Sequence, residues 1–185
     1  MIKIETNRLI LRNFMIEDVE DFFEYMSLES TAKYENFDPM TYDECVATVK
    51  RRIEKDTAMA VVLKDNGKVI GDVSFSEDDY ETFDISYDFN EKFHNMGYAT
   101  EASLAMLNHL FNELGARRVR AECNDDNYAS ISLLERMGMR REGYLIEDVT
   151  FKNDENGKPI YISSYLYAIL KREWELLHLN LKYEF

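Results

Sequence analysis

Cysteine is scarce in this sequence, and its scarcity argues against two classes of site. The chain has 2 cysteines, Cys45 and Cys123, which lie far apart and form neither a CxxC pair nor a Cys/His cluster. A disulfide framework and a structural zinc site are therefore not expected. We interpret each cysteine as a small packing residue, and we expect no metal in the functional site.

Long hydrophobic runs are missing as well. No apolar stretch approaches the ~18 residues that a membrane span needs, and residues 1–6 lack the basic-then-apolar pattern of a signal peptide. Internal repeats, low-complexity segments and linkers rich in Pro, Gly or Ser are also lacking. We therefore expect one domain over residues 1–185, located in the cytoplasm, without a membrane partner.

Basic residues are outnumbered by acidic ones. Lys and Arg total 22 against 36 for Asp and Glu, which gives a formal net charge of -14. Such a charge disfavours general binding to nucleic acid or to anionic membranes, so neither is expected as a partner. A positively charged substrate would suit this field, although acidity that serves solubility alone is an equally open explanation.

Several motifs of other enzyme classes are also missing. The three histidines have no Ser/His/Asp ordering that would indicate a hydrolase, and His109 lies on an inward helical stripe, where we interpret it as a packing residue. The chain also lacks the lysine-Ser/Thr pair of a P-loop and the three glycines of a dinucleotide-binding turn.

Apolar spacing predicts a mixed α/β domain with a central sheet flanked by helices. The segments expected as helices are 17–28, a segment that begins after a Thr41/Glu44 capping box, 100–114, 127–137 and a short helix with a tail over 171–185. The segments expected as strands are 2–11 with a polar interruption at 5–8, 58–63 and 69–75 joined by Asn66-Gly67, 83–89, 117–123, 139–151 and 161–170.

The loop between strand 83–89 and helix 100–114 is a candidate anion site. Gly97 lets the backbone approach a ligand closely, and Asn95 tolerates a positive φ. The free amides and the dipole of the following helix would favour a phosphate there. A plain strand-to-helix connection is the alternative that this loop alone leaves open.

Residues 94–99 read His-Asn-Met-Gly-Tyr-Ala, which resembles the acyl-coenzyme A motif Gln/Arg-x-x-Gly-x-Gly/Ala of the GNAT acetyltransferase superfamily. His94 departs from the usual first residue. Segments 6–12 and 97–102, Asn127-x-x-Ser130 and segment 134–139 are similar to the branch that includes ribosomal-protein N-terminal acetyltransferases. The resemblance extends from about Thr6 to Trp174.

This resemblance implies a GNAT-like twisted, mostly antiparallel sheet whose central strands, 83–89 and 117–123, splay apart around the pantetheine arm of acetyl-coenzyme A. The pyrophosphate would rest on the amides of residues 95–100. The residues implied in coenzyme binding are Phe89, His94, Asn95, Met96, Gly97, Tyr98, Ala99, Thr100, Asn127, Ser130 and Arg136. For Arg136 a solvated helix face is the alternative.

The resemblance also suggests catalytic residues. Many family members protonate the departing thiolate with a tyrosine whose position here is Leu134, so the role passes to Ser130, one helical turn earlier. The alternative is that Ser130 only stabilises the first turn of its helix after Asn127. Asp84 is the implied base, which could accept a proton through water. Asp88 on the same strand face and the later pair Glu147 and Asp148 are further candidates. A surface charge is the alternative for each of these carboxylates, and an amine with a lowered pKa would need no dedicated base.

The predicted function is an N-acetyltransferase that moves the acetyl group of acetyl-coenzyme A directly to a primary amine. The acceptor is a protein N-terminus, an amino acid, a polyamine or another small cationic amine. A non-catalytic acyl-coenzyme A-binding or sensing domain is the alternative, and a structural protein with a vacant site is a third possibility. Strand 161–170 fits burial or a dimer edge, so a monomer and a homodimer both remain open.

Overall fold

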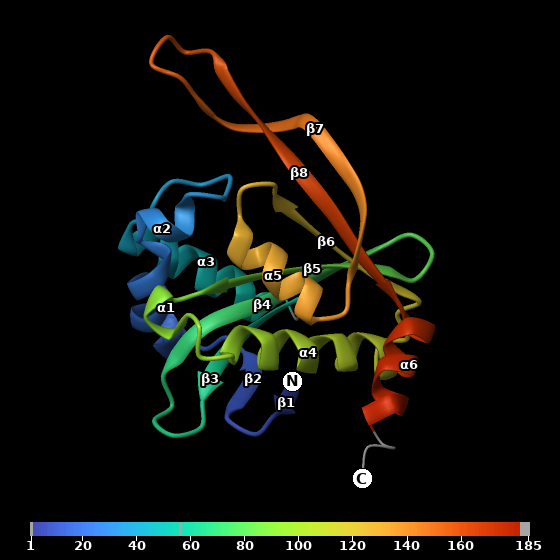
Figure 1. Cartoon of the computed structure of the whole chain (residues 1–185). Coiled ribbons are helices and arrows are strands. Elements are labelled where there is room, and N and C mark those ends of the chain that lie inside the picture. Colours follow the sequence, from blue (N-terminus) through green and yellow to red (C-terminus); the bar gives the residue numbers. More distant parts are fainter. Residues whose placement is uncertain (1, 56, 182–185) are drawn as a thin grey trace.

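One eight-stranded sheet runs through the computed structural model, which describes residues 2–55 and 57–181 (Figure 1). Its strands, in chain order, are β1 (Lys3–Glu5), β2 (Leu9–Asn13), β3 (Ala58–Leu63), β4 (Val69–Asp78), β5 (Thr82–Phe89), β6 (Arg118–Asn124), β7 (Arg140–Asn153) and β8 (Pro159–Leu170). Across the sheet they follow the order β1-β2-β3-β4-β5-β6-β8-β7. Only β5 and β6 pair in parallel, which confirms the predicted mostly antiparallel sheet.

Helices cover both faces of this sheet. They are α1 (Val19–Met26), α2 (Glu29–Ala32), α3 (Tyr42–Glu54), α4 (Tyr98–Asn112), α5 (Tyr128–Arg136) and α6 (Lys171–Leu181), with short 3-10 helices η1 (Ile16–Asp18) and η2 (Glu91–Phe93). No helix within the described residues is long and apolar enough to cross a membrane. The tail predicted after residue 181 lies outside the described residues.

Two hydrophobic cores lie on opposite faces of the sheet, as the alternation along β3 shows. Met59, Val61 and Leu63 belong to the core that includes α4 and α5, whereas Ala60 and Val62 belong to the core that includes α1 and α3. Successive side chains of a strand point to opposite faces. The α4/α5 face and the α1/α3 face are therefore separate environments on either side of β3, β4 and β5.

The polar interruption predicted inside a first strand is a chain reversal. Strands β1 and β2 pair antiparallel, with Ile4 opposite Leu11. The turn is closed by the Thr6 amide, which donates to the Leu9 carbonyl at 3.0 Å, and by the Thr6 hydroxyl, which accepts from the Leu9 amide at 2.9 Å. The prediction of one interrupted strand was wrong because these local bonds stabilise a turn.

Other local predictions are confirmed. Asn66-Gly67 connects β3 to β4, and Gly67 has a φ of 76°. Thr41 and Glu44 form the capping box of α3, with the Glu44 carboxylate 2.8 Å from the Thr41 amide. The segment after α1 begins with the short helix α2 and continues without regular structure to residue 41.

The central strands β5 and β6 splay apart, as predicted. They pair only over Thr82–Asp84 and Arg118–Arg120, at their first residues. Arg120 closes the last paired position, with its Nε and one terminal nitrogen 2.8 and 2.7 Å from the two carboxylate oxygens of Asp84. Beyond this ion pair the two strands no longer bond to each other, and a gap opens between their carboxyl ends.

The hairpin of β7 and β8 is the longest among the described residues and projects away from the body of the sheet (Figure 1). Its register shifts three times, including a shift between Leu145 and Val149 where Glu147 has a φ of 51°. A bulge of this kind bends a strand and redirects its side chains. Val149 and Phe151 of β7 thereby reach the wall of the cavity described next.

Candidate active site

A cavity of about 670 Å³ occupies the gap between β5 and β6. Its walls come from the segment 30–35, β5, the loop 91–97, the start of α4, β6, α5 and the β7–β8 hairpin. The predicted residues that line it are Phe89, His94, Asn95, Gly97, Tyr98, Ala99, Thr100, Asn127, Ser130 and Arg136. Met96 belongs to the same loop but is not among the lining residues.

The loop before α4 has the backbone that an anion site requires. Gly97 has a φ of 79° and precedes the first residue of the 15-residue helix α4, and Asn95 has a φ of 60°. The first intrahelical bond of this turn is donated by Glu101 to the Gly97 carbonyl at 3.0 Å. The amides of residues 98–100 precede that bond and are therefore available to a ligand at the positive end of the helix dipole.

The side chains of Thr6, Arg8 and Glu101 form a clamp that holds this loop. Glu101 accepts from the Thr6 hydroxyl at 2.6 Å and from the Arg8 amide at 2.8 Å, and its second oxygen pairs with the Arg8 Nε at 2.7 Å. Arg8 also donates to the Met96 carbonyl at 3.0 Å and lies over the Tyr98 ring. Segment 6–12, which carried part of the resemblance, thus holds the loop in position.

Two cationic or potentially cationic side chains flank the loop. Arg136 of α5 donates from Nε to the Thr100 hydroxyl at 3.2 Å, which places its guanidinium beside the first turn of α4. The His94 Nε2 lies 2.9 Å from the Phe89 carbonyl oxygen. Because a carbonyl oxygen only accepts, this contact requires the hydrogen on Nε2 and leaves Nδ1 for other partners.

Ser130 lies on the α5 side of the cavity and bonds to two residues. Its amide donates to the Asn127 side chain at 3.1 Å, so Asn127 caps α5 as predicted. Its hydroxyl lies 2.8 Å from the hydroxyl of Tyr87 on β5. Burial raises the pKa of Tyr87 above its ordinary value, so the phenol keeps its proton at neutral pH. The two hydroxyls can therefore supply a proton within the cavity.

Tyr87 was not among the predicted site residues. The alternation of strand 83–89 placed it on the apolar face, where a tyrosine is usually a packing residue. Leu134, at the position where many relatives carry tyrosine, is fully buried in the core. The signal that sequence could have offered was a polar hydroxyl on an apolar strand face next to the predicted gap.

Asp84, the carboxylate implied as a base, is not among the residues that line the cavity. Arg120 binds both of its oxygens, and the same guanidinium also contacts Asp78 at 2.8 Å. Both carboxylate oxygens are therefore engaged with Arg120 outside the cavity. A base within the cavity would therefore have to be an acid other than Asp84.

Asp88, four residues after Asp84 on β5, does line the cavity. Glu35, from the segment after α2, lines it as well. Burial first and the charge on Asp72 second raise the pKa of Glu35 to about 7. Burial first and the charges on Asp72 and Glu35 next raise the pKa of Asp88 well above its ordinary value. Glu147 and Asp148 of β7 are not lining residues.

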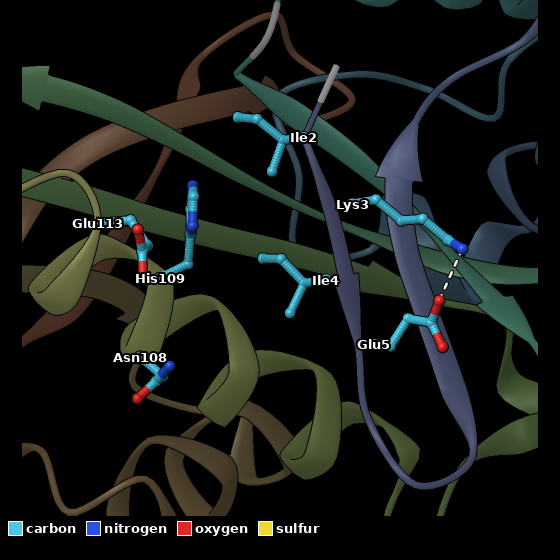
Figure 2. A pocket seen from close by; sticks show the side chains of 7 residues that line it. All are labelled: Ile2, Lys3, Ile4, Glu5, Asn108, His109 and Glu113. Carbon is cyan, nitrogen blue, oxygen red and sulfur yellow. Dashed lines mark ion pairs between the residues drawn. The ribbon is translucent and has the colours of Figure 1, made fainter.

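A second, shallower hollow of about 460 Å³ lies between β1 and α4 (Figure 2). It is lined by Ile2, Lys3, Ile4, Glu5, Asn108, His109 and Glu113. Burial lowers the pKa of His109, which favours its neutral form. His109 does not line the larger cavity.

Comparison with known proteins identifies the family to which this chain belongs. The model of the acetyltransferase (GNAT) domain matches residues 8–140, so the chain belongs to the GNAT family. The protein named uncharacterized N-acetyltransferase YnaD, from Bacillus subtilis strain 168, is 32% identical over 173 residues, which cover 92% of this chain and 98% of the relative. The uncharacterized N-acetyltransferase p20 of Bacillus licheniformis is 29% identical over 91% of this chain and 96% of its own length.

Solved structures agree with this assignment. A GNAT-family acetyltransferase from Bacillus anthracis superposes with a TM-score of 0.86 at 31% identity, covering 92% of this chain and 99% of the other. A ribosomal-protein-S5-alanine acetyltransferase from Vibrio fischeri shares the fold at a TM-score of 0.76 and 18% identity, covering 94% and 99%. The chain is therefore a GNAT acetyltransferase, an enzyme whose family uses acetyl-coenzyme A.

Proposed function

We propose that this enzyme binds acetyl-coenzyme A in the cavity between β5 and β6 and transfers its acetyl group directly to a primary amine. The observation that carries the proposal is the convergence of the α4 loop and the Tyr87–Ser130 pair on one cavity. A loop that presents free amides suits phosphate, and a pair of protonated hydroxyls suits a leaving thiolate.

The residues present fit the coenzyme. The amides that follow Gly97 would receive the pyrophosphate at the start of α4, and Arg136 would add a positive charge there. His94 would present Nδ1 to the same region because its Nε2 is bound to the Phe89 carbonyl. Asn127 supports the site indirectly by capping α5 and holding Ser130 in place.

The pantetheine arm would lie between β5 and β6. Beyond Asp84 and Arg120 these strands do not bond to each other, so backbone groups along their facing edges can bond to a ligand instead. Phe89 lines this gap at the end of β5. The splay thus provides both the room and the backbone partners that an extended arm requires.

Transfer requires three events at the thioester. A neutral amine nitrogen forms a bond to the carbonyl carbon, the bond from that carbon to sulfur breaks, and the thiolate takes a proton. Ser130 would supply this proton from its hydroxyl, Tyr87 would restore it, and water would reprotonate Tyr87. The nitrogen gives up the proton that balances the reaction, either to a carboxylate of the cavity or to water.

A non-catalytic coenzyme sensor was suggested by Leu134 and His94. The Tyr87–Ser130 pair provides the proton donor that Leu134 does not, so the lack of a tyrosine at that position no longer argues against catalysis. No contact of the described residues favours the sensor over the enzyme.

The proposal is tested by incubating the protein with acetyl-coenzyme A and a panel of amines, amino acids and N-terminal peptides. Thiol release that depends on both the enzyme and an amine, with an N-acetylated product in the mass spectrum, is the expected result. Binding of acetyl-coenzyme A without thiol release across the whole panel would support the sensor instead.

A further inference from the structure

Glu35 and Asp88 reach the cavity from different elements. Asp88 belongs to β5, and Glu35 lies three residues after α2, where its amide donates to the Ala32 carbonyl at 3.3 Å. Both side chains line the same cavity, and the charge of Glu35 acts on Asp88. They form a carboxylate pair at the wall of the cavity.

This carboxylate pair lies across the sheet from the proposed proton donors. Asp88 is paired in register with Asp72, whose carboxylate contacts Tyr25 of α1 and Arg52 of α3. Side chains alternate along β5, so Asp88 points to the α1/α3 face while Tyr87 points to the α4/α5 face. The cavity therefore passes through the gap, with the coenzyme residues on one side and the carboxylate pair on the other.

Neither member of the pair has a hydrogen bond or an ion pair from its side chain to any other described residue. The acids around them differ in this respect. Asp72 is bound by Arg52 at 2.7 Å and by the Tyr25 hydroxyl at 2.7 Å, and Glu24 is bound by Lys68 and Lys92. Without such partners the two carboxylates keep their protons more readily than usual, and a ligand that supplies positive charge would favour their charged forms.

Acidic and basic side chains lie on different parts of the cavity wall. Its acidic residues are Glu35, Asp88, Glu91 and Glu122, while its arginine, Arg136, lies at the α4 loop beside Thr100. Arg52, whose charge also acts on Asp88, is engaged with Asp72. No lining residue on the carboxylate side could neutralise a negatively charged group of a ligand.

We infer that Glu35 and Asp88 bind the ammonium group of the acetyl acceptor, and that the acceptor is a small cationic amine without a carboxylate beside its amino groups. The inference rests on the proposed function and narrows its acceptor. Diamines and polyamines satisfy this requirement, whereas a free α-amino acid would bring its carboxylate toward the pair. Repulsion between like charges in a partly desolvated site disfavours that arrangement.

The first test compares three amines with the same carbon chain. They are 1,5-diaminopentane, lysine, which adds a carboxylate to the diamine, and pentylamine, which lacks the second ammonium group. We expect kcat/KM to be highest for the diamine. It should be at least about tenfold lower for pentylamine, which loses one charge-assisted contact, and at least about tenfold lower for lysine, whose carboxylate the pair repels. Equal or better use of lysine would overturn the inference.

The second test changes the pair. Asp88→Asn and Glu35→Gln keep the size of each side chain and remove its charge, so each should raise the KM for 1,5-diaminopentane by about tenfold or more. The KM for acetyl-coenzyme A should stay within about twofold, since this carboxylate pair faces the other side of the gap. An unchanged diamine KM in both variants would contradict the inference.

Glu155→Gln is the matched control. Glu155 is exposed in the turn between β7 and β8, and its substitution changes the net charge by the same amount far from the cavity. We expect it to leave the diamine KM unchanged. A rise equal to that of Asp88→Asn would show that overall charge, and not the pair, attracts the amine, which would overturn the inference.

A third measurement separates this inference from the proposed function. Calorimetry measures the affinity of 1,5-diaminopentane for the coenzyme A complex, so it tests binding by the carboxylate pair even where no turnover occurs. Thiol release with amino acids or peptides but not with diamines would uphold the proposed function and overturn the inference. Diamine binding that Asp88→Asn weakens, without thiol release from any amine, would uphold the pair and contradict the transferase mechanism.

Discussion

The hydroxyl of Tyr87, on β5, lies 2.8 Å from the hydroxyl of Ser130, on α5. This contact bridges the gap between a central strand and the helix that follows the other central strand. It gives Ser130 a partner that can restore a donated proton, because burial raises the pKa of Tyr87 and keeps it protonated. The pair therefore defines where the coenzyme sulfur would be met.

Removal of either hydroxyl should slow the chemical step. We expect Tyr87→Phe and Ser130→Ala each to lower kcat by about 10- to 100-fold with little change in the KM for acetyl-coenzyme A, since proton transfer typically contributes a factor of this order or more. The double variant should be little slower than either single one, because the two residues act as a unit. Steady-state kinetics of the four proteins would show this. If both single variants kept the wild-type kcat, neither hydroxyl would take part in the chemical step.

Gly97 offers a test of the coenzyme loop with a built-in control. Its φ of 79° is unfavourable for a β-branched residue, and Gly157, in the distal β7–β8 turn, has a similar φ of 77°. Gly97→Val should weaken coenzyme A binding by about tenfold or more, by moving the amides of the α4 turn. Gly157→Val should bear a similar backbone strain without affecting binding. Calorimetric titration would decide, and equal affinities in two folded variants would contradict the loop assignment.

Arg8 should act as a positioning residue. Arg8→Ala removes the contacts to Glu101 and to the Met96 carbonyl that hold the loop, so we expect the KM for acetyl-coenzyme A to rise by about tenfold while kcat changes less. Arg140→Ala is the matched control, because Arg140 pairs with Glu142 and Glu173 away from the cavity. A KM that is the same in both variants would show that the clamp does not position the loop.

Glu35 should leave a signature in the pH dependence of stability. Its pKa is raised from 4.5 to about 7 in the folded protein, so the folded state binds more protons than the unfolded state between these values. The free energy of unfolding should therefore fall as pH rises from about 4.5 to about 7, by roughly 1–2 kcal/mol after allowance for partial solvent screening. Chemical denaturation across this range would measure the fall.

The variant Glu35→Gln isolates this contribution from that of Asp88, whose raised pKa acts in the same direction. The wild type should lose stability relative to the variant as pH rises through the window. A constant difference between the two proteins would mean that Glu35 titrates normally. Saturation with a cationic amine should reduce the loss, because an ammonium group favours the charged carboxylate.

Local rules predicted much of the fold. Asn66-Gly67 marked the β3–β4 turn and Thr41 with Glu44 marked the start of α3, because both signals depend on residues a few positions apart. The splay of β5 and β6 followed from the resemblance. The turn at residues 6–8 was missed because its bonds involve a side chain whose partner the periodicity does not reveal.

The residues proposed to bind the coenzyme were predictable from sequence, and those proposed to bind the acceptor were less so. Gly97, Arg136 and Ser130 belong to motifs with fixed spacing, and the structure brings them to one cavity. Glu35 lies in an irregular segment more than fifty residues from Asp88, and only the folded sheet brings the two together. Tyr87 escaped prediction for the related reason that its partner, Ser130, comes from another element.

Direct transfer is tested most simply by mass spectrometry of a single reaction. The enzyme is mixed with acetyl-coenzyme A first alone and then with 1,5-diaminopentane, and the masses of the protein and of the amine are followed together with free thiol. Direct transfer predicts an unmodified protein in both mixtures, and thiol release matched by N-acetylated diamine in the second. An acetylated protein formed before the amine is added, or no acetylated amine from any member of the panel, would contradict it.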